Sequence, residues 1–254
     1  MMLAFVAAGL VSSAAFMARL LTPGGAVAAT MVGTAVVVGG MKWIALLLFF
    51  FITSSALSRW RSAERERLIW TMVHKGSRRD ATQVLANGGI FAISAVWSTA
   101  ADELSWQAIG IGAIAAAVSD TWSTEIGTVI GGRPRMITSG REVAPGTSGG
   151  ITIAGSIGAL VGAVSTAVVA MLVGWDVPAA AIVAGGIAGS LVDSLVGAFL
   201  QERRWCPACS APTERPIHTC GTTSKHRGGI RGCDNDIVNV LSTLAGAAVT
   251  WTLL

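Results

Sequence analysis

The sequence predicts an all-α protein, a polytopic integral membrane helical bundle with 7–8 transmembrane helices. Hydrophobic residues make up 52% of the 254 residues and charged residues only 13%, and the mean hydropathy is +0.64. This composition is too apolar for an ordinary soluble domain. The apolar residues form long segments of about 20 residues, the length that an α-helix needs to cross a bilayer. Glycine, alanine, serine and threonine are frequent in them, and small residues let helices pack closely in lipid.

The spanning segments are expected in chain order near residues 1–19, 24–41, 43–58, 86–101, 104–130, 150–173, 178–200 and 234–253. The first segment carries no basic leader, so we expect it to stay in the protein as a helix and not to be removed as a signal peptide. The whole chain, 1–254, is predicted to form a single membrane domain. Its polar loops are expected near 59–85, 131–149 and 201–233.

The basic residues predict the orientation of the bundle. With eight helices, every one of the 18 lysines and arginines except Lys42 falls in loops on one side. Loops rich in lysine and arginine remain in the cytoplasm. We therefore expect both termini outside and the three large basic loops, together with any active site that they form, on the cytoplasmic side.

Carboxylates lie inside or at the edge of the predicted helices, where an unpaired charge at mid-bilayer costs roughly 2.5–3.5 kcal/mol even on the mildest scale. The candidates are Asp120, Glu125, Asp193, Asp234 and Asp236. On the predicted topology they converge on the cytoplasmic side. One interpretation is an internal hydrogen-bond cluster; the other, which we favour, is a Mg²⁺ site, since carboxylate oxygens together with substrate phosphates are typical ligands of that ion.

Two loops beside these acids suit phosphate groups. Arg133, Arg135 and Arg141 precede the turn Pro145-Gly-Thr-Ser-Gly-Gly150, which opens the next helix. Backbone N–H groups at such a turn and helix N-terminus bind anions, and its glycines permit close approach of a ligand. An ordinary tight turn is the alternative.

The second phosphate-suited loop runs through residues 74–89. Lys75, Arg78 and Arg79 can neutralise phosphate charge, and Asn87 follows them into the membrane. A basic, solvated helix start is the alternative. Asn235 and Asn239, next to the acids of the last helix, complete the candidate nucleotide and phosphate ligands.

All three histidines lie in the loops, so the predicted helices contain no histidine base. This disfavours serine–histidine hydrolysis. Phosphoryl transfer to a phosphate monoester remains compatible, because its attacking oxygen is already anionic and catalysis consists mainly of positioning and charge neutralisation.

All four cysteines lie in the last loop, which on the predicted topology is a reducing environment. Cys206-Pro-Ala-Cys209 and His218-Thr-Cys220 together offer the ligand types of a small structural zinc site. The alternative is a set of reduced thiols that only pack the loop.

Five motifs carry a resemblance to a known family: "SDTWSTEIG", "PRMITSGREVAPGTSGGIT", "LVDSLVGAFLQ", "CPAC…HTC" and "GIRGCDNDIVNVLSTLAGA". In this order, and over nearly the whole chain, they resemble the polytopic membrane family that contains plant phytyl-phosphate kinase and animal transmembrane protein 19. The resemblance implies a CTP-dependent, Mg²⁺-dependent kinase that converts an isoprenyl monophosphate, such as phytyl or geranylgeranyl phosphate, to the diphosphate.

The resemblance also implies roles for single residues. Asp120, Glu125 and Asp193 would hold Mg²⁺, with Asp234 and Asp236 completing the cluster or a second metal site. Arg135, Thr147, Ser148 and Gly149 would contact the nucleotide phosphates. Lys75, Arg78 and Arg79 would hold the acceptor phosphate, and the bundle would admit the prenyl chain from the bilayer.

Rival functions remain open at this stage. The same metal site would serve a cytidylyltransferase that forms a CDP-lipid, or a prenol kinase. A lipid transporter is the non-enzymatic alternative, suggested by weakly similar motifs around Asp120 and Asp193. The expected partners are an isoprenoid lipid phosphate and a nucleoside triphosphate, with a second copy of the chain as an option and no nucleic acid.

Overall fold

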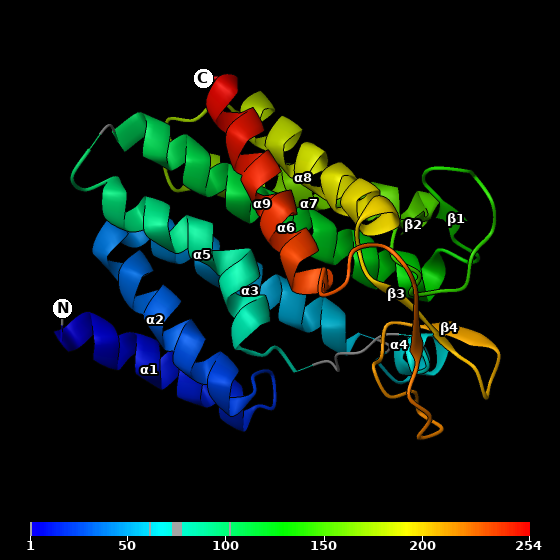
Figure 1. Cartoon of the computed structure of the whole chain (residues 1–254). Coiled ribbons are helices and arrows are strands. Elements are labelled where there is room, and N and C mark those ends of the chain that lie inside the picture. Colours follow the sequence, from blue (N-terminus) through cyan, green and yellow to red (C-terminus); the bar gives the residue numbers. More distant parts are fainter. Residues whose placement is uncertain (1, 61, 73–77, 102) are drawn as a thin grey trace.

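The computed structural model describes residues 2–60, 62–72, 78–101 and 103–254 and consists mainly of helices (Figure 1). Eight long helices match the expected segments in order: α1 (Met2–Met17), α2 (Pro23–Gly39), α3 (Met41–Arg59), α5 (Ala81–Trp97), α6 (Glu103–Ile130), α7 (Ile153–Leu172), α8 (Ala179–Phe199) and α9 (Asn235–Thr252). A short helix, α4 (Ser62–Ile69), lies in the loop before α5. The predicted fold class is therefore confirmed.

Helix α5 begins earlier than expected, at Ala81 and not near residue 86. Asp80 and Gln83 form a capping box there: the Asp80 carboxylate accepts the Gln83 backbone N–H at 2.9 Å, and the Gln83 side chain accepts the Asp80 N–H at 3.2 Å. Two backbone donors at the helix start are thus satisfied. This polar first turn lies before the apolar stretch on which the sequence prediction depended.

Short strands in the loops are an addition that the all-α prediction did not contain. β1 (Arg135–Met136) pairs antiparallel with β2 (Gly150–Ile151). β3 (Arg203–Cys206) lies between β4 (Ala211–Thr213) and β5 (Lys225–Gly228) in a second antiparallel sheet. Figure 1 shows these strands and α4 gathered at one end of the bundle.

Helix α6 is the centre of the bundle. It packs against α3, α5, α7, α8 and α9, and its residues 111–119 are completely or almost completely buried. Small residues allow the close approach: a methyl group added at Gly189 of α8 or at Gly246 of α9 would collide with Ala116 of α6. In lipid, such close backbone contact is a principal source of helix association.

The end of the bundle away from the strands is closed by aromatic packing. The Trp43 ring lies 4.9 Å from the Phe91 ring and 4.8 Å from the Trp175 ring, centroid to centroid. All three side chains belong to the main hydrophobic core. The core therefore extends from this end along α6, and the polar groups collect at the other.

By length and composition alone, α3, α7 and α8 are apolar enough to cross a membrane, and α1, α2 and α5 are shorter apolar helices. The basic loops meet at the strand-bearing end. The Glu214 N–H donates to the Met72 carbonyl at 2.9 Å, and the Arg79 N–H donates to the Leu20 carbonyl at 3.0 Å. The loops thus share one end as predicted, while the compartment that this end faces stays a prediction.

Candidate functional site

A polar cavity of about 450 Å³ lies where the loops meet the bundle. Its walls come from α4, α6 and α8, from the N-terminal ends of α5, α7 and α9, from the loop 132–152 and from the segment 201–216. Three helix N-termini therefore border one cavity. Since the helix dipole gives each N-terminus a partial positive charge, this arrangement suits an anionic ligand.

Two acidic residues from different helices meet at the base of the cavity. Asp120 of α6 and Asp193 of α8 line it, and their carboxyl groups are close enough to interact with each other directly. Two carboxyl groups this close must share a proton or a cation, because both cannot be ionised side by side without one. Asp193 Oδ2 is buried and has no hydrogen-bond partner among the residues that the structure describes.

Asp234 lines the same cavity from the start of α9. Its carboxylate caps the helix, because Oδ1 accepts the backbone N–H groups of Asp236 at 3.1 Å and Ile237 at 3.2 Å. The cap fixes the Asp234 side chain at the cavity edge, and its second oxygen accepts no hydrogen bond from the part of the chain that the structure describes. The neighbouring Asn235 also lines the cavity.

The charge balance of the cavity favours a divalent cation. Among the described lining residues, the acids are Asp120, Asp193, Glu202, Glu214 and Asp234, and the bases are Arg65 and Arg204. Such a site would repel a polyphosphate unless cations accompanied it. Hard carboxylate oxygens, one of them buried without a partner, fit Mg²⁺, and the ion would be held by Asp120, Asp193 and Asp234.

The glycine-rich turn forms a second wall. Gly146 and Gly149 both have φ of +80°, a conformation that favours glycine, and a Cβ at Gly149 would lie 2.5 Å from the Ala198 Cβ. The backbone N–H groups of Gly146, Ser148 and Gly149 donate to no residue within the described ranges. These N–H groups can therefore serve an anion.

A relay of side chains connects the turn to the three-stranded sheet. The Ser148 hydroxyl donates to Gln201 Oε1 at 2.6 Å, and Gln201 Nε2 donates to Glu214 Oε1 at 2.8 Å. Burial, reinforced by the Asp234 charge, raises the pKa of Glu214 to about 7. Glu214 thus titrates near neutral pH beside the other acids.

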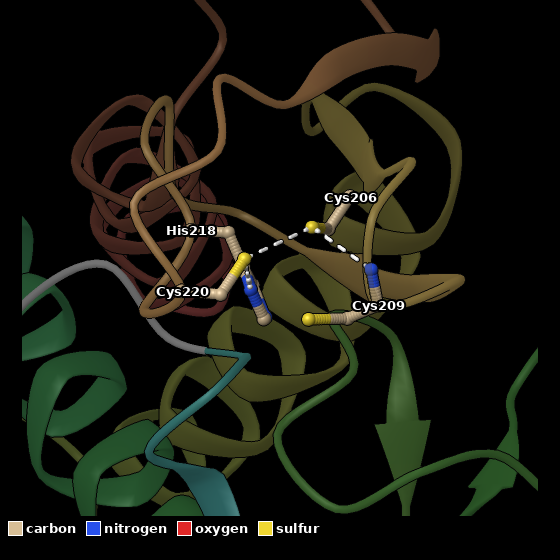
Figure 2. Close-up of side chains that lie close together, drawn as sticks. All are labelled: Cys206, Cys209, His218 and Cys220. Carbon is tan, nitrogen blue, oxygen red and sulfur yellow. Dashed lines mark hydrogen bonds between the residues drawn. The ribbon is translucent and has the colours of Figure 1, made fainter.

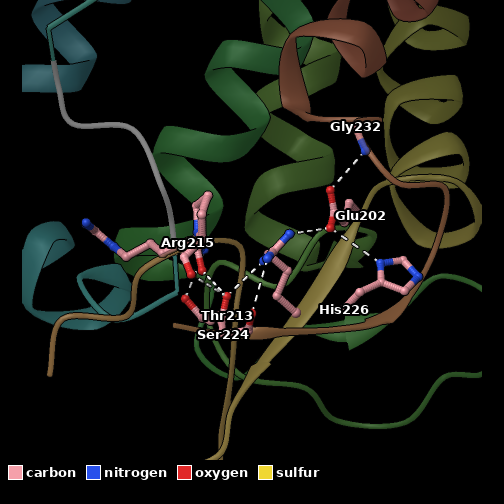
Figure 3. Close-up of polar contacts among 8 residues, drawn as sticks. Glu202, Thr213, Arg215, Ser224, His226 and Gly232 are labelled. Atoms are coloured by element: carbon pink, nitrogen blue, oxygen red, sulfur yellow. Dashed lines mark hydrogen bonds and ion pairs between the residues drawn. The ribbon is translucent and has the colours of Figure 1, made fainter. Parts of the chain in front are cut away.

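Glu202 and Arg204 complete the sheet side of the cavity. Figure 3 shows Glu202 receiving the Gly232 backbone N–H, at 2.9 Å, and facing His226 Nδ1 at 3.4 Å. The Gly232 N–H, with help from His226 and Arg204, lowers the pKa of Glu202 below its usual range. Arg204 in turn donates from Nε to the Ser224 hydroxyl at 2.8 Å, which fixes its guanidinium at the cavity wall.

A second, apolar groove of about 250 Å³ lies between α1, α2, α3 and α5. Its polar lining includes Arg79, Gln83 and Asn87, and Gln83 lines the polar cavity as well. Arg79 donates to the Ser55 hydroxyl at 3.0 Å. The apolar groove therefore has the cationic Arg79 in its lining and, through Gln83, borders the polar cavity.

The structure separates Glu125 from the other acids. Its carboxylate lies 2.8 Å from Arg65 Nε and accepts the Ser58 hydroxyl at 2.7 Å, and it does not line the cavity. Asp120 and Glu125 are five residues apart on one helix and so lie about 140° apart around its axis. The predicted role of Glu125 as a metal ligand has no support in this geometry. The ion pair with Arg65 accounts for the burial of the Glu125 carboxylate.

Other candidates also lie outside the cavity lining. Asp236 and Asn239 are buried in α9, Arg135 binds the Gly140 carbonyl on the surface, and Arg78 donates to the Leu21 carbonyl. Lys75 lies outside the described residues. The cavity brings together Asp120, Asp193, Asp234, Asn235, Thr147, Ser148 and Gly149.

Sequence reasoning missed several lining residues. On α6 these are Ser123, Thr124 and Thr128, which with Asp120 and Gly127 recur at helical spacing and form one face. That periodicity was available in the sequence. Arg65 was interpreted only as a topological signal, and Gln201, Glu202, Arg204 and Glu214 belong to a loop whose path the sequence does not reveal.

Comparisons with known proteins agree with this fold. Residues 6–247 match the family model described as integral membrane protein DUF92. The chain is 29% identical to Protein PGR of Arabidopsis thaliana over 97% of this chain and 93% of that protein. It is 35% identical to an uncharacterized membrane protein of Methanocaldococcus jannaschii over 65% of this chain and 67% of that protein. No solved structure matches the chain.

Proposed function

The chain belongs to the integral membrane family DUF92, and from this membership and the geometry of the polar cavity we propose that it is a Mg²⁺-dependent, CTP-dependent kinase of isoprenyl monophosphates. The reaction would transfer the γ-phosphoryl group of CTP to phytyl or geranylgeranyl phosphate and release CDP. The motifs set out above suggest the substrates, and the cavity supports the phosphoryl-transfer chemistry.

The observation that supports this proposal most is the pairing of Asp120 with Asp193 in a cavity whose glycine-rich turn offers backbone N–H groups without an acceptor in the described ranges. A kinase must neutralise the triphosphate and position it, with little further covalent chemistry. Bound Mg²⁺ would supply charge neutralisation at the phosphates. The turn at Ser148 and Gly149 and the guanidiniums of Arg65 and Arg204 would hold the triphosphate oxygens.

The acceptor needs no strong base in this reaction. Its monophosphate oxygen is already anionic at neutral pH and can attack the γ-phosphorus of CTP without losing a proton. A new O–P bond forms between them while the bond between the γ-phosphorus and the CDP oxygen breaks. Orientation of the two phosphates is then the main task of the protein. This fits a cavity whose described lining contains no histidine.

The apolar groove would receive the prenyl chain. It is lined by α1, α2, α3 and α5, of which α1 lies at the edge of the bundle (Figure 1), and its polar lining includes Arg79 and Gln83. A hydrocarbon chain in the groove would place its phosphate at Arg79, next to the polar cavity that Gln83 also lines. Because the prenyl chain comes from the bilayer, which is as apolar as the groove, the fit of the chain to the groove and the contact of its phosphate with Arg79 would decide binding.

The test is a product assay with detergent-purified protein, Mg²⁺, CTP labelled on the γ-phosphate and geranylgeranyl monophosphate. We expect labelled geranylgeranyl diphosphate together with CDP. A CDP-lipid and pyrophosphate would assign the cavity to cytidylyl transfer. No Mg²⁺-dependent turnover with prenyl phosphates or prenols, by protein that binds CTP, would refute the kinase proposal.

A further inference from the structure

Four potential metal ligands meet in the loop between α8 and α9. Cys206, Cys209, His218 and Cys220 each place one ligand atom so that all four lie within 4.8 Å of one another (Figure 2). The Cys206 and Cys220 sulfur atoms are 3.6 Å apart, and His218 Nδ1 is 3.2 Å from the Cys220 sulfur. All four cysteines of the chain are free thiols.

These separations match the ligand shell of a tetrahedral zinc ion. A Zn–S bond of about 2.3 Å places two thiolate ligands about 3.8 Å apart across a tetrahedron edge. The observed distance between the Cys206 and Cys220 sulfur atoms, 3.6 Å, is far longer than a disulfide bond of about 2.0 Å. Three thiolates with one imidazole are a soft ligand set that is typical of structural zinc.

The ligands are placed where they can hold the three-stranded sheet together. Cys206 ends β3, Cys209 lies in the turn to β4, and His218 and Cys220 lie between β4 and β5. The three strands have only four, three and four residues. Sheets this small need an additional source of stability, because they bury little apolar surface.

The same sheet carries a wall of the polar cavity. Arg204 lies in β3, Glu202 directly precedes β3, and Glu214 directly follows β4. Among the described residues, the sheet is joined to the segment after α4 by the Thr213 hydroxyl, which donates to the Thr71 carbonyl at 2.8 Å, and by the Glu214 N–H, which donates to the Met72 carbonyl at 2.9 Å. The position of Glu202, Arg204 and Glu214 therefore depends on how firmly the strands are joined.

We propose that Cys206, Cys209, His218 and Cys220 bind one structural Zn²⁺ and that this ion fixes the β3–β5 sheet as a wall of the polar cavity. The ion acts on fold and positioning only, because none of its four ligands lines the cavity. Zinc binding does not depend on the kinase proposal, whereas an effect on CTP binding rests on it.

Elemental analysis of the full chain tests the zinc site directly. The protein is purified in detergent without chelators, by a tag that lacks histidine, and we expect about one zinc per chain. Cys206→Ser and Cys220→Ser should contain at least fivefold less zinc. Cys233→Ser is the matched control, because Cys233 is a buried cysteine of the same loop outside the cluster, and it should keep its zinc. A zinc-free wild type, or full zinc in Cys206→Ser, would overturn the proposal.

A second measurement uses only the wild type, so that zinc binding can still be tested if the cysteine variants fail to fold. A thiol-reactive mercurial should release one zinc per chain into a chromogenic indicator, and Co²⁺ added to the metal-free protein should give the visible absorption of a tetrahedral thiolate site. Absence of both signals would contradict zinc binding. These readouts do not require catalysis, so a failed kinase assay leaves them intact.

Discussion

The carboxyl groups of Asp120 on α6 and Asp193 on α8 lie beside each other in the lining of the polar cavity and interact directly. The contact joins two helices that are separated in the chain by all of α7. Close packing of Ala116 against Gly189, one helical turn deeper, lets the two backbones approach enough for it. A pair of acids held in this way is a strained arrangement without a shared proton or cation, and this makes it the first target for mutation.

Asp193→Asn should reduce kinase turnover at least about 100-fold, because charge stabilisation at a metal site amounts to several kcal/mol. The free energy of unfolding should stay the same or rise, since the remaining carboxyl group no longer needs to share a proton or a cation with a neighbouring acid. Initial rates with CTP and prenyl monophosphate, together with thermal unfolding followed by tryptophan fluorescence, measure both effects. Asp176→Asn, an exposed acid in the loop between α7 and α8, is the control. Normal turnover in Asp193→Asn would exclude Asp193 from the site.

Glu125→Gln should act mainly on stability. It leaves Arg65 without its 2.8 Å ion-pair partner in a mostly buried position, and we expect a loss on the order of 1–3 kcal/mol. The double variant Arg65→Gln, Glu125→Gln should lose less than the sum of the single variants, since the pair is removed as a unit. A large fall in turnover with an unchanged unfolding temperature would instead return Glu125 to the metal site.

Gly149→Ala should raise the KM for CTP and destabilise the protein. The residue has φ of +80°, and its new Cβ would lie 2.5 Å from the Ala198 Cβ, so the turn must move away from α8. Gly140→Ala is a matched control, because Gly140 has φ of +67° but nothing within 4 Å of the added Cβ. Both variants carry backbone strain of about 1 kcal/mol, and only Gly149→Ala carries the collision. Equal kinetic effects in the two variants would contradict a role of the turn in nucleotide binding.

Ala29→Phe should fill the apolar groove and raise the KM for the prenyl monophosphate at least tenfold while leaving the KM for CTP unchanged. Ala29 lines the groove from α2, whereas Val27, on the same helix, is 64% exposed and does not line it. Val27→Phe is therefore the control for added bulk. An equal KM for the lipid in both variants would place the prenyl chain elsewhere.

Glu202 should make stability depend on acid pH. Its pKa is lowered in the folded protein, chiefly by the Gly232 N–H, from the usual 4.5. The stabilising contribution is therefore complete above pH 4.5 and is lost as the pH falls through the lowered pKa. At pH 7, Glu202→Gln should have a free energy of unfolding about 1 kcal/mol lower than that of the wild type, and it should therefore unfold at a lower temperature. This difference between the two proteins should shrink in acid. A difference that does not change with pH would indicate that the Glu202 charge is not responsible.

The apolar segments determined the helices. Long hydrophobic stretches predicted seven or eight long helices, and the structure has eight, each within a few residues of one of the expected segments. The clustering of arginines predicted which loops would lie together, because alternating helices return to the same end. Local motifs also predicted the glycine-rich turn and the cysteine–histidine cluster, since the residues of each lie close together in the chain.

Only the tertiary structure decided which acids face one another. Asp120 and Asp193 meet because α6 and α8 pack through small residues, a contact between segments far apart in sequence. Glu125 faces away because five residues along a helix rotate a side chain by about 140°, and Arg65 of the α4 segment meets it there. Composition and spacing fix what each segment is, whereas the contacts between distant segments depend on packing that a linear pattern does not encode.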